Sequence, residues 1–276
     1  MATALREPAA PERRWVPRPL SVAGTFLRVA LLHEVQYRVN FYLQLVQSVV
    51  TVGTALAVLA LVFGYTPTLA GWSQDELLIV MGVHVLLGGV IQTFIQPNMT
   101  RLLEEIREGA LDFALTKPMD AQWLVSIRQL RVWHLTDVLV GAVLVSIGVV
   151  QVGFPGFAQL ALFGVTLVLG AVLIYCVWLA VTITAFWAVR MDVLVELFDG
   201  LYQAGRWPVT IYPGWLRVGF TFVVPLAFAV TVPAEALTLR LTGGTMLAAF
   251  ALTAAFVLAT RVWWRFGLRH YAGASA

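Results

Sequence analysis

Five long stretches of this sequence contain no Asp, Glu, Lys or Arg residue, and this absence constrains the fold more than any other feature. A helix needs about 20 apolar residues to cross the hydrocarbon core of a membrane. Ionised side chains are costly in that core, so uncharged stretches of this length are typical of membrane spans. The sequence therefore predicts an all-α integral membrane protein. The stretches are residues 39–74, 77–100, 138–189, 218–234 and 241–260.

The third stretch is too long for one span, because 138–189 contains 52 residues. It must fold back on itself, and Gly153, Pro155 and Gly156 lie where the turn is expected. Two crossings here and one in each other stretch give six transmembrane helices. A composition of 60% apolar and 12% charged residues agrees with this, since it lies far outside the range of soluble domains and leaves no segment for a second folded domain.

The basic residues predict the orientation, because Lys and Arg are retained on the cytoplasmic side of a membrane. Of the 18 basic residues, 15 lie before the first span, in the link 100–132, at Arg190 or near the end of the chain. Both termini are therefore expected in the cytoplasm, with the protein in the inner (plasma) membrane. The net charge of +3 reflects this bias, so it gives no reason to expect nucleic-acid binding.

The predicted organisation is a cytoplasmic tail at 1–19, a single transmembrane domain at 20–270 and a C-terminal cytoplasmic tail at 271–276. The first tail is rich in Arg and Pro and lacks the apolar core of a signal peptide. The segment 20–38 gathers apolar residues on one helical face and is expected to lie along the inner interface. Hydropathy places the spans at about 41–64, 77–96, 133–153, 157–189, 218–232 and 243–264.

The first span carries polar residues on one face, at Gln44, Gln47 and Thr51. Amides are costly toward lipid, so this face is expected to meet protein or water. Small residues form separate stripes on the first and last spans, and both stripes are expected to serve close helix packing. Their members are Gly53, Ala57, Ala60 and Gly64 in the first span, and Ala248, Ala251, Ala255 and Ala259 in the last.

The link between the second and third spans is far longer than a connector requires. It predicts a short amphipathic helix at the cytoplasmic face, with Gly109 as a break and Pro118 as a stop. The acidic side of this helix is either solvated or in contact with a protein, and repulsion from an anionic inner leaflet favours a protein partner. The apolar side has Leu102, Leu103, Ile106, Ala110 and Phe113, and the acidic side has Glu104, Glu105, Glu108 and Asp112.

A second set of charged and polar residues recurs on one helical face between residues 192 and 206. In one interpretation, Arg190 and Arg206 neutralise the acidic members at the cytoplasmic end of a helix. In the other, this acidic stripe faces a substrate or the interface between two chains, because ionised groups at membrane depth must meet protein or water. The members of the stripe are Asp192, Glu196, Asp199, Gln203 and Arg206.

The sequence contains no recognisable catalytic motif. The only lysine, Lys117, follows Thr116 and not the glycine of a phosphate-binding loop, and HExxH and GxSxG motifs are absent. We therefore expect no catalytic, cofactor or metal site on this chain. For His84, His134 and Asp137, a proton relay, a metal site and plain burial all remain open.

Several segments, taken in order, resemble the permeases of the ABC-2 superfamily, and more narrowly its small six-span permeases that are encoded in pairs beside one ATPase. They are EVQYRVNFYLQL, PNMTRLLEEIREGALDFALTKPMD, FWAVRMDVLVELFDGLYQAGRWPVTIYPGWLR and VVPLAFAVTVPAEAL. The similarity covers about residues 20–269. It implies a fifth span at 192–212 in place of 218–232, and a re-entrant pair of short helices before the last span.

By the same resemblance, the amphipathic link would be a coupling helix that docks into an ATP-binding subunit. The residues implied in this coupling are Leu102, Glu104, Glu105, Ile106, Glu108, Gly109, Leu111, Asp112, Phe113, Leu115 and Pro118. The residues expected to line a substrate pathway or an interface between permeases are Gln44, Gln47, Thr51, Asp192, Glu196, Asp199, Gln203 and Arg206.

The expected function is that of the permease subunit of an ATP-binding cassette exporter for a small amphiphilic compound, which can be cationic. Two ATP-binding subunits would bind ATP and Mg²⁺, and a sister permease, or else a second copy of this chain, would complete the assembly in the lipid bilayer. One alternative is an ion- or proton-coupled secondary transporter that uses the acidic stripe and His84. Another is an intramembrane enzyme that uses His134 and Asp137.

Overall fold

The structure is a computed structural model of the 276-residue chain, and it describes residues 24–25, 28, 38–187, 192–223 and 225–271. The predicted interfacial helix at 20–38 and the predicted tails at 1–19 and 271–276 lie almost entirely outside these residues. Arg190 also lies outside them. The predictions for these segments stay predictions.

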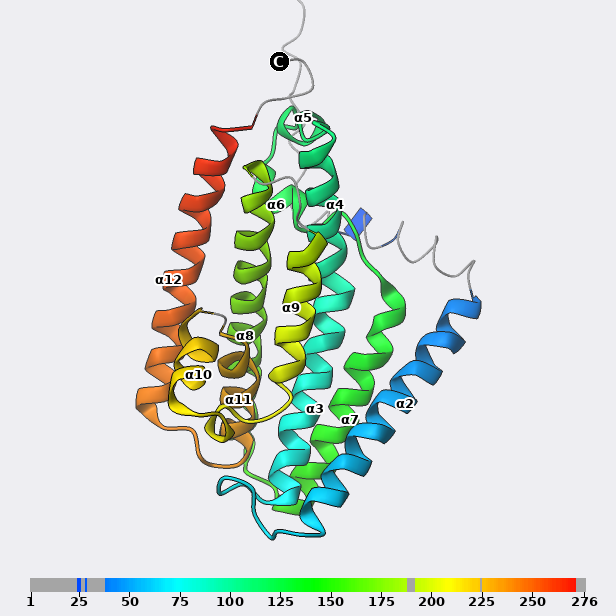
Figure 1. The fold of residues 1–276 in the computed structure, drawn as a ribbon, viewed down its shortest axis with the longest axis vertical. Coiled ribbons are helices and arrows are strands. Elements are labelled where there is room, and N and C mark those ends of the chain that lie inside the picture. Colours follow the sequence, from blue (N-terminus) through cyan, green and yellow to red (C-terminus); the bar gives the residue numbers. More distant parts are fainter. Residues whose placement is uncertain (1–23, 26–27, 29–37, 188–191, 224, 272–276) are drawn as a thin grey trace, which may run out of the picture.

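Among the described residues, five helices are long and apolar enough to cross a membrane, which confirms a multi-span, all-helical architecture (Figure 1). The second of these spans is longer than expected, because α3 continues through a π-helical turn, η1 (Ile91–Ile95), into α4 (Gln96–Arg107). The predicted amphipathic helix is thus the direct extension of a membrane span. The long helices are α2 (Arg38–Phe63), α3 (Gln74–Val90), α7 (Leu135–Val152), α8 (Phe157–Ile183) and α12 (Gly243–Leu268).

The turn predicted inside the longest uncharged stretch is confirmed. α7 ends at Val152 and α8 begins at Phe157. Gly153 and Gly156 between them have φ angles of +108° and +102°, which residues other than glycine rarely adopt. Glycine at both positions therefore permits the reversal of direction.

The tightest helix packing joins α3 to α7, where glycines on both helices allow close backbone approach. A Cβ atom added at Gly141 would lie 2.4 Å from the backbone nitrogen of Leu86, and one added at Gly89 would lie 2.6 Å from that of Val138. The small-residue stripes predicted to serve this purpose are on other helices. Their members on α2 and α12 are exposed in this chain, so for packing within the chain that prediction is wrong.

The chain between α8 and α12 returns along the bundle, because these two helices run in the same direction (Figure 1). α9 (Asp192–Ala204) begins this return, but its 13 residues extend only about 20 Å, less than the thickness of a hydrocarbon core. The return continues through η4 (Val209–Ile211), α10 (Gly214–Val218), η5 (Gly219–Val223) and α11 (Leu226–Leu237).

Neither position predicted for the fifth span is one continuous helix. The 192–212 segment leaves α-helical geometry after Ala204, and the 218–232 segment is divided at Pro225, before α11. The sixth crossing and the re-entrant pair stay predictions.

One end of the bundle carries the knob, the name given to residues 96–131. It contains α4, α5 (Asp112–Leu115) and α6 (Ala121–Val125), and it lies at the same end as the C-terminus of α12 (Figure 1). Two short 3-10 helices, η2 (Val132–His134) and η3 (Thr184–Phe186), lead into α7 and out of α8.

At the opposite end, the link between α2 and α3 is fastened by Arg240, which precedes α12. Arg240 forms two hydrogen bonds with Glu76, at 2.9 and 2.7 Å, and its guanidinium lies 4.6 Å from the centre of the Trp72 ring. Glu76 also completes a capping box with Ser73 at the start of α3.

Candidate functional site

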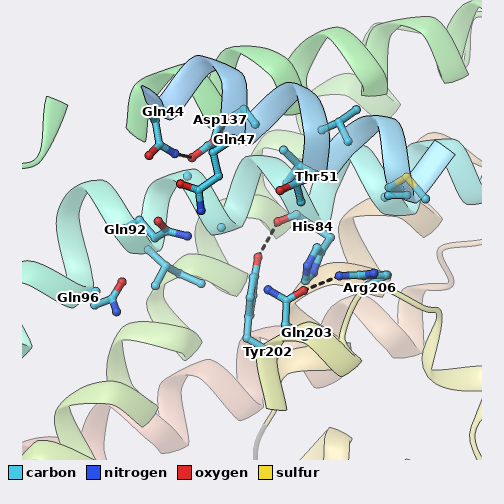
Figure 2. Close-up of a pocket in the computed structure, with 18 of the residues that line it drawn as sticks. Gln44, Gln47, Thr51, His84, Gln92, Gln96, Asp137, Tyr202, Gln203 and Arg206 are labelled. Atoms are coloured by element: carbon cyan, nitrogen blue, oxygen red, sulfur yellow. Dashed lines mark hydrogen bonds between the residues drawn. The ribbon is translucent and has the colours of Figure 1, made fainter. Parts of the chain in front are cut away.

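A polar cavity of about 320 Å³ lies among α2, α3, η1, α7 and α9 (Figure 2). Amide groups dominate its polar lining, although the surrounding helices are largely apolar. Polar groups at membrane depth are costly unless they meet water, protein or a ligand, so their convergence marks this cavity as a candidate site. The polar residues of the lining are Gln44, Gln47, Ser48, Thr51, His84, Gln92, Gln96, Asp137, Tyr202, Gln203 and Arg206.

Asp137, at the start of α7, connects α2 to the rest of the site. One of its carboxylate oxygens accepts a hydrogen bond from Gln44 Nε2 at 3.0 Å, and the other accepts one from the Ser48 hydroxyl. His134 Nδ1 lies 3.2 Å from the first of these oxygens. Three partners therefore surround the carboxylate, and two of them belong to α2.

His84 of α3 and Tyr202 of α9 form the opposite wall of the cavity (Figure 2). Their rings stack with centres 4.4 Å apart, and the Tyr202 hydroxyl donates a 2.6 Å hydrogen bond to the His84 carbonyl oxygen. His84 is buried, and its Nδ1 has no hydrogen-bond partner. A buried ring nitrogen without a partner costs free energy, which a bound polar group or water would recover.

Arg206 and Gln203 follow Tyr202 on the same side of the cavity. Arg206 Nη2 donates a 2.6 Å hydrogen bond to Gln203 Oε1, which fixes both side chains near the end of α9 (Figure 2). The cavity thus has a guanidinium on one wall and the Asp137 carboxylate on another. A polar solute could find both signs of charge and neutral amide groups there.

The knob buries one face of α4 and exposes the other. Leu102, Leu103 and Ile106 are buried against the protein, whereas Glu104 and Glu108 are exposed. The apolar face is therefore part of the protein core, and the acidic face remains available to a partner.

The apolar side chains beyond Gly109 differ sharply in exposure. Leu111 is fully buried, and its N–H donates a 3.1 Å hydrogen bond to the Tyr271 hydroxyl. Phe113 is 78% exposed and Leu115 is 38% exposed. Phe113 and Leu115 therefore place exposed apolar surface at the tip of the knob.

The Asn98 junction ties η1 and the start of α4 to the segment that leads into α7; it consists of Thr93, Asn98, Gln129 and Arg131. Asn98 donates to the Gln129 carbonyl at 2.7 Å and accepts from the Gln129 N–H at 2.8 Å. Pro97 has no N–H to offer the Thr93 carbonyl one turn earlier, and that carbonyl accepts from the Arg131 N–H at 3.1 Å. Two backbone segments are thereby held together next to the π-helical turn.

An ion pair reinforces this connection two turns further along α4. Arg128 donates from two nitrogens to the two carboxylate oxygens of Glu105, at 2.9 and 2.6 Å. Arg101 donates to the same carboxylate at 3.0 Å. Paired hydrogen bonds between a guanidinium and a carboxylate fix orientation as well as distance. A displacement of α4 would consequently be transmitted to the segment that begins α7.

Residues 49–275 match the family described as ABC-2 family transporter protein. The chain belongs to this family. Comparison with curated proteins and with solved structures gave no match. As an ABC-2 permease, the chain is a multi-pass membrane protein of a family whose members lack the ATPase domain, which lies on a separate subunit. Membership implies an ATP-binding subunit as partner.

The cavity of this ABC-2 permease collects five of the residues that the sequence suggested for a substrate pathway. They come from two helices, α2 and α9, and from the turn that follows α9. Glu196 is exposed and is not among the residues that line the cavity. Asp192 and Asp199 lie on α9, but their side chains are outside the described part of the chain. The five residues are Gln44, Gln47, Thr51, Gln203 and Arg206.

Several lining residues of the ABC-2 permease were not predicted to belong together. His84 and Asp137 were considered together with His134 as a possible proton relay or metal site, but they were not placed with the polar face of α2, and Gln92, Gln96 and Tyr202 were not noticed. Gln92 and Gln96 are one turn apart in an uncharged stretch, which is the same signal that identified Gln44 and Gln47. Among the described residues, no group of three or more His, Cys, Asp or Glu side chains is arranged to bind a metal.

Proposed function

We propose that this ABC-2 permease is the membrane subunit of an ATP-driven exporter, and that the cavity beside α2 belongs to the route of a small amphiphilic compound. The observation that carries the proposal is the unbroken helix from Gln74 to Arg107. The middle of this helix lines the cavity through His84 and Gln92, and its C-terminal end is part of the knob. A subunit that pushes the knob therefore acts directly on the α3 wall of the cavity, whereas it reaches the α7 and α2 walls only through the contacts between α4 and the segment before α7.

The ATP-binding subunit docks on the tip and the acidic face of the knob in this proposal. Phe113 and Leu115 supply apolar contact, and Glu104 and Glu108 supply charge. An exposed aromatic residue with charged neighbours is the usual composition of an interface centre and its rim. Leu102, Ile106 and Leu111 are buried, so their part in coupling is to support the docking surface from within.

Movement of the docked knob reaches the substrate route through the Asn98 junction. The junction holds the start of α7 against the end of α3, and Asp137 follows one and a half turns after Arg131 along the chain. Asp137 in turn holds Gln44 and Ser48 of α2. Each ATP-driven displacement would thus shift α7, and α2 with it, and change access to the cavity.

A cationic amphiphile is the substrate class that we propose. The sequence argument for cations rested on the acidic stripe, but the carboxylate known to line the cavity is that of Asp137. A cationic group could take over the interactions that Gln44, Ser48 and His134 provide to this carboxylate. The apolar part of the substrate would contact Val52, Ala55 and Phe198, which also line the cavity.

The working assembly in this proposal has two permeases and two ATP-binding subunits, with ATP and Mg²⁺ bound on the latter. The exposed face of α2 supports a second permease, because most of this helix has few contacts within the chain. A sister permease fits the resemblance best, and a second copy of this chain is the alternative. Family membership leaves the secondary transporter and the intramembrane enzyme without support.

The knob is cytoplasmic in this proposal, which follows from the basic residues near it. Single cysteines at Thr68 and Thr116, introduced on a Cys176→Ala background, place two exposed residues at opposite ends of the bundle. An impermeant thiol reagent added to intact cells is expected to label Thr68→Cys and to leave Thr116→Cys unlabelled. Labelling of Thr116→Cys alone would reverse the orientation.

Two exposed phenylalanines provide a matched test of ATPase docking. Phe113 is at the tip of the knob, and Phe154 is 63% exposed in the turn between α7 and α8 at the other end. Phe113→Asp is expected to remove most of the co-purified ATP-binding subunit and most export, whereas Phe154→Asp should leave both unchanged. A Phe113→Asp permease that retains its ATPase and exports at the wild-type rate would contradict the docking assignment.

A further inference from the structure

A second, larger recess lies away from the polar cavity, between α8, α12, η1 and α6. Its volume is about 1010 Å³, and its walls are mostly apolar. The wall residues in the membrane spans include Val90, Phe94, Val168, Val172 and Val257. Because these helices are membrane spans, an open recess between them is filled by lipid chains unless another protein covers it.

The end of the recess nearest the knob is polar and carries one charge of each sign. Arg261 donates to both carboxylate oxygens of Asp120, and it also donates to Gln122 Oε1 at 2.7 Å. Both charged side chains remain partly exposed, at 37% for Arg261 and 45% for Asp120. The hydrogen bonds from Arg261 lower the pKa of Asp120, so the pair carries full opposite charges at neutral pH.

Neutral hydrogen-bonding groups lie beside this ion pair. The hydroxyls of Ser126 and Tyr175 are 2.8 Å apart, and the Trp123 ring also lines the recess. Tryptophan is favoured at the level of lipid headgroups. The recess therefore passes from apolar walls to neutral polar groups and then to an ion pair. A phospholipid has the same order of chemistry, from its acyl chain through its ester region to its headgroup.

We propose that this recess binds one zwitterionic aminophospholipid from the leaflet on the knob side. Its acyl chain lies along α8 and α12, its phosphate meets Arg261 and its ammonium meets Asp120. The paired charges favour a headgroup that also carries both signs, whereas an anionic headgroup would match Arg261 and be repelled by Asp120. Occupancy would tie α6 of the knob to α12.

Lipid retained by the purified full-length chain tests this proposal. The chain is washed in detergent that contains equal amounts of phosphatidylethanolamine and phosphatidylglycerol, and bound lipid is counted by native mass spectrometry. We expect the chain to retain about fivefold more phosphatidylethanolamine than phosphatidylglycerol. This is the ratio that one favourable charge contact at a membrane surface provides. Equal retention of the two lipids would overturn the headgroup assignment.

Three variants separate the recess from general lipid contact. Ala171→Phe fills the recess and should reduce retained phosphatidylethanolamine about fivefold, while Val150→Phe, at an 81% exposed position on α7, should not. Asp120→Asn is at an exposed position and should abolish the preference for phosphatidylethanolamine without unfolding the chain.

Unchanged lipid retention in Ala171→Phe would overturn the proposal. Dissociation of an oligomer in that variant, with lipid retention intact, would assign the recess to a second copy of the chain. Should Ala171→Phe prevent folding, the preference measured in Asp120→Asn still decides the headgroup assignment, because a preference equal to that of the wild type contradicts it.

Discussion

α2 and α3 are adjacent membrane spans of similar apolar character, yet α3 is mostly buried within the bundle and α2 is mostly exposed. In the most apolar part of each span, 67% of the α3 residues are buried and only 17% of the α2 residues are. α3 packs closely against α7 and continues into the knob, whereas α2 contacts the bundle through a few residues, including Ser48, Ala55 and Leu59.

The difference shows that hydropathy identifies a span but does not determine its neighbours. What distinguishes α3 is the position of its glycines: Gly82 and Gly89 lie against the backbone of α7, whereas Gly53 of α2 has no atom within 4 Å. α3 is accordingly suited to transmit force, and α2 is suited to move or to meet another chain. The predictions below test this division.

The largest expected effect is a loss of stability when Gly141 of α7 is replaced, compared with the replacement of Gly53 of α2. Gly141→Ala places a Cβ atom 2.4 Å from the Leu86 backbone nitrogen, so α3 and α7 must separate. We expect a loss of about 3 kcal/mol in the free energy of unfolding, measured by thermal or denaturant unfolding in detergent. Gly53→Ala on α2, where no atom lies within 4 Å, is the control and should change stability little. Equal effects of the two substitutions would remove the contrast between α2 and α3.

Glu105 and Glu104 provide the next comparison, within the knob. Glu105→Gln weakens the paired hydrogen bonds to Arg128, a side chain only 10% exposed, and should cost about 2 kcal/mol of unfolding free energy. Glu104→Gln changes an exposed residue and should cost less than about 0.5 kcal/mol. The same unfolding measurement on both variants checks the prediction, and a stable Glu105→Gln protein would mean that the ion pair does not hold the knob.

Asp137 tests whether the attachment of α2 matters for transport. Asp137→Asn keeps the shape of the side chain but removes the charge that Gln44 and Ser48 contact. Export of a cationic amphiphile should fall about tenfold, and export of a neutral analogue should fall less. Transport assays of both compounds, at matched protein levels, make the comparison. Equal losses for both would show that Asp137 positions α2 without selecting charge.

The smallest expected effect concerns Asp120 and pH. Its pKa is lowered by the hydrogen bonds from Arg261, so the pair stabilises the fold above the ordinary pKa of an aspartate and loses that contribution as the pH falls through the lowered value. Because the pair is partly exposed, the contribution should be below about 1 kcal/mol. The stability difference between the wild type and Asp120→Asn should therefore be present at pH 7 and vanish in strong acid. A difference that persists there would have another origin.

The sequence predicted the five long helices of the described residues because charge exclusion is a property of each segment by itself, and the sixth crossing stays a prediction. The turn after Val152 was predicted for the same reason, since glycine and proline act locally. The helix partners were not predicted: glycines on α3 and α7 carry the close packing, while the small residues expected to do so, such as Gly53, are exposed. Helix contacts depend on which faces of different helices meet, and no local pattern within a single segment indicates that pairing.

The site was predicted in part for a similar reason. A polar face within one helix, such as Gln44 and Gln47, can be recognised from spacing alone. The meeting of that face with His84 and Asp137 depends on how α2, α3 and α7 pack together. The Asn98 junction likewise requires the segment after α6 to return to the π-helical turn, which no local pattern indicates.

The central claim is that the Asn98 junction transmits ATP-driven movement of the knob to the cavity, and a thiol-labelling experiment tests it most directly. A cysteine replaces Gln47 in the cavity, on a Cys176→Ala background, and its labelling rate is measured in the complete transporter with and without ATP and Mg²⁺. We predict that nucleotide changes this rate severalfold, and that Asn98→Ala abolishes the change while the ATP-binding subunit remains bound. If nucleotide changes the labelling rate equally in the wild type and in Asn98→Ala, the Asn98 junction does not transmit the movement.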